Sequence, residues 1–180
     1  MFSRITAIVV LALSMSVPAF AADSPNYELF SQVQKQVLRY PSFSIFDSVH
    51  ISVNAGVVEL TGKVTMPFKR DAIGERVARV KGVSTVRNRI DVLPVSQFDD
   101  ELRFRIARAI YSNSNFYGYG SRVNPPIHVI VERGRVTLEG VVNSNVDRRI
   151  AQSIANSFGA FKFTNDLKTE AEAKAELEKL

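Results

Sequence analysis

Hydrophobic and polar residues alternate along two neighbouring stretches of the chain with the period of a β-strand. In residues 49–54 every second residue is Val or Ile, and residues 58–64 continue the same alternation. A period of two places one set of side chains on one face of a sheet. Residues 54–56 separate the two stretches and end in Gly56, which favours a three-residue connection with a type I turn and a left-handed glycine. The pattern predicts a β-hairpin with one buried face.

This hairpin pattern occurs twice in the chain. The sequence VHISVNAGVVELTGKV at residues 49–64 aligns without a gap with IHVIVERGRVTLEGVV at residues 127–142. Glycines recur at the same places, once at the turn and once inside the second strand, where a missing side chain indicates a bulge or a close approach by another backbone segment. We therefore interpret five glycines as structural: Gly56, Gly62, Gly82, Gly134 and Gly140.

Helix-like stretches flank each hairpin, with apolar residues spaced to form one stripe. A strand-like segment closes each copy, GVSTVRNRIDV from Gly82 and GAFKFTNDLKT from Gly159. The downstream helices align at a spacing that is one residue shorter in the second copy. The stripes are Phe30, Val33 and Val37 and then Leu102, Ile106, Ala109 and Ile110 before the hairpins, and Ile73, Val77 and Val80 and then Ile150, Ile154 and Ser157 after them.

The predicted unit is therefore α-β-β-α-β, and the chain is predicted to contain two of them in tandem. Each unit has about seventy residues, near the lower limit for folding around a single core, so we expect the copies to pack on each other. The predicted order is a signal peptide at 1–21, a first domain at 27–94, a linker at 95–98, a second domain at 99–169 and an acidic helical tail at 170–180.

The amino terminus has the features of a secretory signal. Arg4 supplies a positive start, residues 5–17 are apolar but too short to span a bilayer, and small residues precede an expected cleavage after Ala21. The alternative is that this stretch remains as an uncleaved anchor. The chain contains no cysteine, which excludes a disulfide framework and a lipid-modified cysteine. We expect a periplasmic mature chain, soluble after cleavage and without a transmembrane segment.

Three stretches make the chain similar to the BON family of bacterial envelope domains: VHISVNAGVVELTGKV, RVARVKGVSTVRNRIDV and IHVIVERGRVTLEGVV. The resemblance covers about residues 27–168. It implies an α+β fold, with two helices on one face of a small mixed three-stranded sheet in each domain. It also implies a protein that binds phospholipid surfaces or assists other envelope proteins under osmotic stress, and that is not an enzyme.

The net charge of the chain bears on the kind of partner it binds. Without residues 1–21 the chain has 22 basic and 18 acidic side chains, a net charge of +4. Both predicted domains are basic and the tail is acidic. This excess is modest, whereas nucleic-acid-binding proteins show denser basic stripes, so the charge disfavours a nucleic-acid partner.

The second copy carries the candidate contact surface. Its first helix presents two arginines one turn apart and leads into YSNSNFYGYGSRVNPP at residues 111–126, which is rich in aromatics and glycine. Aromatic rings suit the boundary between lipid head groups and acyl chains, and arginine pairs with phosphate. The hypothesis assigns contact with an anionic phospholipid or an envelope protein to Arg105, Arg108, Phe116, Tyr117, Tyr119 and Arg122. The alternative is that these aromatics fold back over a small core.

Catalytic chemistry has little support in the sequence. The two histidines, His50 and His128, occupy equivalent hairpin positions in separate copies, and the chain has no Gly-x-Ser-x-Gly motif and no glycine-rich phosphate loop. We expect no metal and no cofactor. Two functions remain, a binding module for anionic membrane or an envelope component, and a periplasmic chaperone that shields unfolded proteins. Salt weakens the first kind of contact and not the second.

Overall fold

The structure, a computed structural model, describes residues 25–178 of the chain. The predicted signal peptide lies outside the described residues. The first domain contains α1 (Pro25–Leu38), β1 (Ser48–Asn54), β2 (Val57–Val64), α2 (Pro67–Ala78), β3 (Thr85–Asn88) and β4 (Asp91–Val92). The second contains α3 (Gln97–Tyr111), η2 (Ser114–Phe116), α4 (Tyr117–Gly120), β5 (Ile127–Glu132), β6 (Arg135–Val142), α5 (Asn145–Asn156) and β7 (Lys162–Thr169), and α6 (Glu170–Leu177) follows it.

The two sheets have the same topology. In each, the second hairpin strand lies in the centre, antiparallel to the first strand and parallel to the third, so the orders are β1-β2-β3 and β5-β6-β7. The third position of the first sheet is split, because β3 and β4 both pair with β2. The prediction of two tandem α-β-β-α-β domains with mixed sheets is confirmed.

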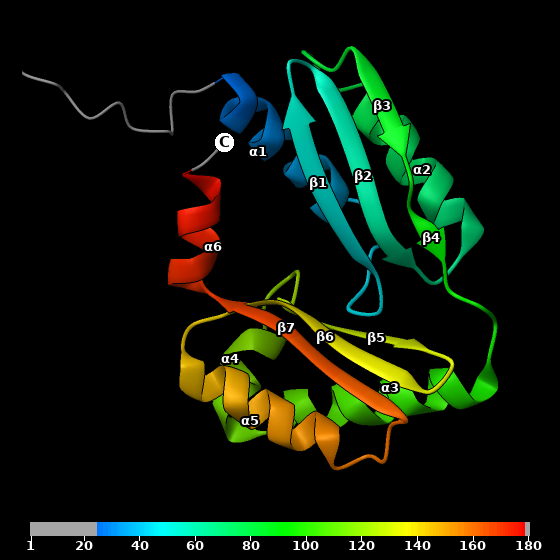
Figure 1. Cartoon of the computed structure of the whole chain (residues 1–180), viewed down its shortest axis with the longest axis vertical. Coiled ribbons are helices and arrows are strands. Elements are labelled where there is room, and N and C mark those ends of the chain that lie inside the picture. Colours follow the sequence, from blue (N-terminus) through cyan, green and yellow to red (C-terminus); the bar gives the residue numbers. More distant parts are fainter. Residues whose placement is uncertain (1–24, 179–180) are drawn as a thin grey trace, which may run out of the picture.

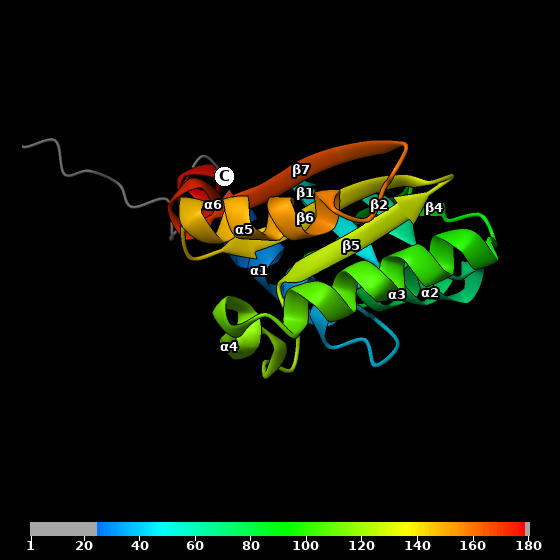
Figure 2. The same ribbon diagram turned by 90° about the horizontal axis from the view of Figure 1, so that it is seen from below.

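Each domain has its own hydrophobic core, in which two helices cover one face of the sheet (Figure 1). In the first domain, Val33 of α1 and Ile73 of α2 are fully buried against Val58 and Leu60 of β2. In the second, Ile106 of α3 packs in the same cluster as the strands β5 and β6. Figure 2 shows α3 and α5 side by side on the outer side of the second sheet.

The hairpin turns differ from the prediction. Asn54 pairs with Val57, so the connection has two residues, Ala55 and Gly56, and both have positive φ (47° and 80°). Positive φ at both central positions is the signature of a type I′ turn, whose twist matches that of the flanking strands. The three-residue connection was therefore wrong, and the turn at residues 133–134 repeats the same geometry with φ of 51° and 71°.

The first turn of each leading helix holds the hairpin turn of its own domain. Asn26 Oδ1 accepts a hydrogen bond of 3.3 Å from Ala55 N. In the second domain the buried Asp99 carboxylate accepts from Arg133 N at 2.7 Å and Gly134 N at 2.8 Å. These contacts satisfy turn donors that would otherwise lack a partner in the protein.

The strand glycines allow a close approach of two backbones. A Cβ on Gly62 would lie 2.3 Å from Ser48 O, and a Cβ on Gly140 would lie 1.8 Å from Pro126 O. Both glycines have positive φ, 111° and 120°. A side chain at either position would displace the first strand of the hairpin.

The alignment of the second helices was off by one residue. Ile73 and Val77 are fully buried in α2, and the fully buried residues of α5 are Ala151 and Ala155, each 78 positions later. Ile150, the predicted counterpart of Ile73, is only partly buried. The one-residue deletion therefore falls after α5. The prediction followed the larger apolar side chains, whereas the helix geometry places the alanines towards the sheet.

The predicted tail forms the helix α6, which caps itself and pairs with the second domain. Thr169 and Glu172 form a capping box, and Glu172 pairs with Arg148 of α5 at 2.9 Å. None of the side chains of α6 is buried. Over residues 25–178, no helix combines the length and the apolar character needed to cross a membrane.

Candidate functional site

The loop between α1 and β1, residues 39–47, extends from the first domain onto the second. Ile45 O accepts a hydrogen bond of 2.8 Å from Val129 N on β5. Ile45 and Phe46 pack against the core of the second domain, and the Phe46 ring meets Phe104 of α3 edge-on, with 4.7 Å between centroids. The loop therefore protects part of an open strand edge and adds apolar side chains to a core of the other domain.

Asp47 fixes the conformation of this loop. Its fully buried carboxylate accepts hydrogen bonds from Ser44 N and Oγ, both at 2.8 Å, and from Thr65 N and Oγ1 at 2.8 and 3.0 Å. The buried Lys69 of α2 donates to it at 2.7 Å. Five donors replace the water that the charge loses on burial. Nothing in the alternation pattern indicated this network, because the donors come from three different elements.

Glu139 of β6 is the polar centre of the junction between the domains. It accepts a hydrogen bond from Ser48 Oγ, and its Oε2 lies 2.9 Å from Nε2 of His50, both on β1. Lys63 of β2 pairs with Glu132 at the end of β5. The side of the second sheet that does not face its helices therefore meets the end of the first domain, as Figure 1 shows.

The second histidine lies at the same junction but in a different environment. The ring of His128 is 5.6 Å from that of Phe43, between centroids, and its buried Nδ1 has no hydrogen-bond partner among residues 25–178. Burial lowers the pKa of His128. The hydrogen bond to Glu139 raises the pKa of His50, and burial of that ring opposes the shift in part. Burial alone would raise the pKa of Glu139, but the hydrogen bonds from His50 and Ser48 leave it lowered.

These opposite shifts predict that stability has a maximum near pH 6.5, the ordinary histidine pKa. The His50 contact is complete below that pH and is lost as the pH rises through the raised pKa. The neutral His128 contributes fully above that pH and loses stability as the pH falls below it. Lys168 and Asp166 of β7 also face His50, and Asp47 and Glu139 face His128.

Urea unfolding between pH 5 and pH 8 checks this prediction. His50→Gln should remove the loss of stability on the alkaline side and leave the acidic side unchanged. His128→Gln should do the reverse. Equal pH profiles for the two variants would contradict the assignment.

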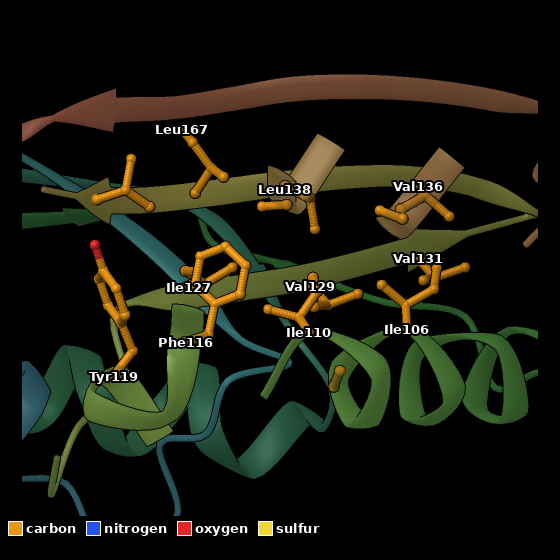
Figure 3. Packing of buried hydrophobic residues seen from close by; sticks show 14 of the residues in the cluster. Ile106, Ile110, Phe116, Tyr119, Ile127, Val129, Val131, Val136, Leu138 and Leu167 are labelled. Atoms are coloured by element: carbon orange, nitrogen blue, oxygen red, sulfur yellow. The ribbon is translucent and has the colours of Figure 1, made fainter. Parts of the chain in front are cut away.

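Phe116 and Tyr119 do not lie on the surface. Phe116 is fully buried, and Tyr119 is 4% exposed in the same core (Figure 3). Tyr119 Oη donates to Asp147 at 2.9 Å and accepts from Asn143 N at 2.7 Å. The assignment of these two rings to a lipid or partner contact is therefore corrected, since leaving the core would cost their burial and these hydrogen bonds. The alternative, that the aromatics fold back over the core, holds for both.

The other four candidate residues are exposed. Arg105 and Arg108 lie on the face of α3 that points away from the sheet, and Arg105 stacks over Phe158 at 5.4 Å. Tyr117 is 78% exposed, and Arg122 is exposed above the ring of Tyr119 at 5.1 Å. Figure 2 shows α4, which begins at Tyr117, beside the carboxyl end of α3.

Two exposed apolar residues of this region were missed. Phe104, one turn before Arg108, is 61% exposed, and Val123, next to Arg122, is 98% exposed. Val123 was not predicted to be a contact residue, because the apolar contacts of this loop were predicted from its aromatic residues alone. We use the name α3 surface for the exposed residues of α3 and of the segment that follows it: Phe104, Arg105, Arg108, Tyr117, Arg122 and Val123.

The remaining chemistry of the junction does not indicate a metal centre. His50 and His128, which the sequence placed in separate domains, both lie near Glu139. The part of the chain that the structure describes nevertheless contains no group of three or more His, Asp or Glu side chains suited to hold a metal ion.

Two α-β-β-α-β domains of one topology, joined by a short linker and meeting at a polar junction, define a class of tandem-repeat proteins. The BON domain model matches residues 28–94 and 99–176, and the chain belongs to the BON-domain family. This is a family of binding modules associated with phospholipid and the bacterial envelope, and it is not known for catalysis. The second match extends into α6, which had been predicted to be an acidic tail outside the second domain.

Comparisons with individual proteins add little to the family assignment. No curated protein matches the chain. Two similar solved structures are of CdsD, described as a structural protein of the type III secretion system of Chlamydia trachomatis; the second is of its C-terminal domain. Both are 13% identical over 83% of this chain, covering 97% and 68% of theirs, with TM-scores of 0.30 and 0.31.

Proposed function

We propose that this protein is an exported, non-catalytic binding module of the bacterial envelope that contacts anionic phospholipid through the α3 surface. The family supports the class of ligand, and the amino-terminal residues 1–21 support export to the periplasm. The observation that carries the proposal is the exposure of Arg105 and Arg108 on the outer face of α3 and of Tyr117 at the start of α4. Arginine pairs with lipid phosphate, and an exposed aromatic ring suits the head-group boundary.

The arginines should provide most of the attraction to an anionic membrane. Each basic side chain near such a surface contributes about 1 kcal/mol, so replacing Arg105, Arg108 and Arg122 with glutamine should cost about 3 kcal/mol, more than a hundredfold in affinity. Sedimentation with vesicles containing phosphatidylglycerol, over a salt series, measures this loss. The parent protein should bind less well as the salt concentration rises.

A matched control removes the same charge elsewhere. In the first domain Arg87 and Arg89 are exposed and Arg70 is half-buried, and replacing all three with glutamine should change vesicle binding far less. Replacing Tyr117 and Val123 with serine should weaken binding with little dependence on salt, because that contribution is apolar. If the parent does not bind anionic vesicles, or if the folded variant lacking Arg105, Arg108 and Arg122 binds as the parent does, the proposal is wrong.

A chaperone that shields unfolded envelope proteins is the second candidate function. Exposed apolar side chains near the linker favour it: Met66 and Phe68 at the start of α2, and Val95 and Phe98 at the start of α3. Suppression of the aggregation of an unfolded outer-membrane protein, measured by light scattering, tests it. Suppression that persists in high salt and is lost in Phe68→Ser with Phe98→Ser would favour the chaperone over the lipid module.

A further inference from the structure

A small cavity lies between the carboxyl-terminal ends of α1 and α2, on the first domain. Its volume is ≈ 190 Å³, and Gln36, Arg76, Arg79 and Val80 line it. Two arginines and one glutamine thus line an opening that none of the contacts at the domain junction uses. The α3 surface belongs to the other domain.

Arg76 is held in place but is not satisfied. Its guanidinium carbon lies over the ring of Tyr40, 5.7 Å from the centroid. Its Nε is buried and has no hydrogen-bond partner among the described residues. A buried donor without a partner costs free energy, about 1–3 kcal/mol and more for a charged group, so its persistence requires an explanation.

The chain around the cavity is strongly basic. The segments 35–39 and 75–81 contain five basic residues and one acidic residue: Lys35, Arg39, Arg76, Arg79 and Lys81, and Glu75. Glu75 pairs with Arg79, at 3.4 Å, and both side chains are exposed. Among residues 25–178, Arg76 has no ion pair with a carboxylate.

The second copy provides an internal comparison. Leu29 corresponds to Leu102 and Ile73 to Ala151, so the positions of Gln36, Arg76 and Arg79 correspond to Ala109, Ile154 and Ser157. None of these three counterparts is a cation, although Arg105 stacks over Phe158, the counterpart of Val80. The fold itself does not require the two arginines.

We propose that this cavity is a binding site for a phosphate group. Guanidinium groups bind tetrahedral oxyanions with paired, charge-assisted hydrogen bonds, and the amide of Gln36 adds a donor at the rim. The phosphate would accept from the buried Nε of Arg76. Cations near the carboxyl-terminal ends of helices also interact favourably with the helix dipole. That interaction explains charges near the helix ends, but it leaves Nε without an acceptor.

Nuclear magnetic resonance of the arginine Nε–H groups tests the proposal with two probes. Glycerol 3-phosphate represents a soluble phosphate ester, and vesicles of phosphatidylcholine with phosphatidic acid represent a lipid head group. The Arg76 Nε–H signal should shift in a saturable way with glycerol 3-phosphate. Vesicle binding is measured by sedimentation in the variant with Arg105, Arg108 and Arg122 replaced by glutamine, so that the α3 surface does not contribute.

Arg76→Gln should weaken binding of whichever probe the protein binds at least tenfold. If this variant does not fold, Arg79→Gln, at an exposed position, provides the same test. Arg70 lies on the same helix and pairs with Asp71 outside the cavity. Arg70→Gln is therefore the control, and its affinity for the probe should be unchanged. If the affinity for glycerol 3-phosphate depends on Arg76, the ligand is a soluble phosphate ester. If only the affinity for vesicles depends on Arg76, the ligand is a lipid head group. The site is overturned if the parent does not bind glycerol 3-phosphate and the variant lacking Arg105, Arg108 and Arg122 does not bind the vesicles. It is also overturned if the folded Arg76→Gln and Arg79→Gln variants bind the probe as tightly as the protein without these substitutions.

Discussion

Replacing Gly140 with alanine should destabilise the second domain by about 3–5 kcal/mol, a large part of the stability of a small domain. The new Cβ would lie 1.8 Å from Pro126 O, which is backbone and cannot rotate away, and the φ of 120° at this position is one that alanine rarely adopts. The backbone strain at this φ and the overlap of the Cβ with Pro126 O both lower the stability of the domain. Urea unfolding, followed by circular dichroism, measures the loss.

Gly118 provides the matched control for this substitution. Nothing lies within 4 Å of a Cβ built on Gly118, which is exposed in the short helix α4. Alanine there should be neutral or slightly stabilising, since alanine favours a helix over glycine by up to about 1 kcal/mol. Gly62→Ala, with its contact at 2.3 Å, should resemble Gly140→Ala in the first domain. Similar stability of the Gly118 and Gly140 variants would show that the strands do not approach this closely.

Replacing Asp47 with asparagine should destabilise the protein by about 3–5 kcal/mol, because it leaves the ammonium group of Lys69 buried without its counter-charge. The Nδ2 group of asparagine would also face donors, either Ser44 N and Lys69 Nζ or Thr65 N. Free energies of unfolding from urea titrations measure the cost.

The control for Asp47 is the other member of the pair. Lys69→Met should cost less than Asp47→Asn, because the carboxylate keeps four hydrogen bonds from Ser44 and Thr65. The double variant should be more stable than the sum of the single losses predicts, since it removes both charges together. A smaller loss for Asp47→Asn than for Lys69→Met would contradict this account of the network.

The repetition of one pattern made the topology predictable. Two hairpins with glycines at matching positions, each between helical stripes, define the order of the elements before any contact is known. Gly62 and Gly140 were predicted to be structural because each lacks a side chain within a strand. The short distances from a Cβ built at these positions to Ser48 O and Pro126 O show why glycine is needed there. Local pattern and backbone geometry agree at these positions.

Predictions failed where geometry depends on more than periodicity. The type I′ turns need positive φ at Ala55 and Arg133, which neither residue type favours, so composition pointed to a longer connection. The sequence also could not separate Phe116 from Tyr117, since they are adjacent aromatic residues in a loop without a periodic pattern. The first is fully buried and the second exposed, because only the path of η2 and α4 decides which ring faces the strands.

The junction was not predictable for a different reason. Asp47 joins a loop, the end of β2 and α2, and Glu139 accepts from a strand 91 residues earlier in the chain. Contacts of that separation have no periodic signature. The contact between Glu139 and β1 follows from how one folded domain meets the other, which the pattern within each domain does not specify.

The two copies differ in the loop that follows their first helix, and this difference gives the two domains unequal roles in their contact with each other. The loop of the first copy reaches forward, where Ile45 and Phe46 meet the next domain. The loop of the second copy turns inward, where Phe116 and Tyr119 fill its own core. The two domains are therefore not interchangeable, because only the first extends a loop that completes the core of its neighbour, in contrast to the identical units of a regular repeat array.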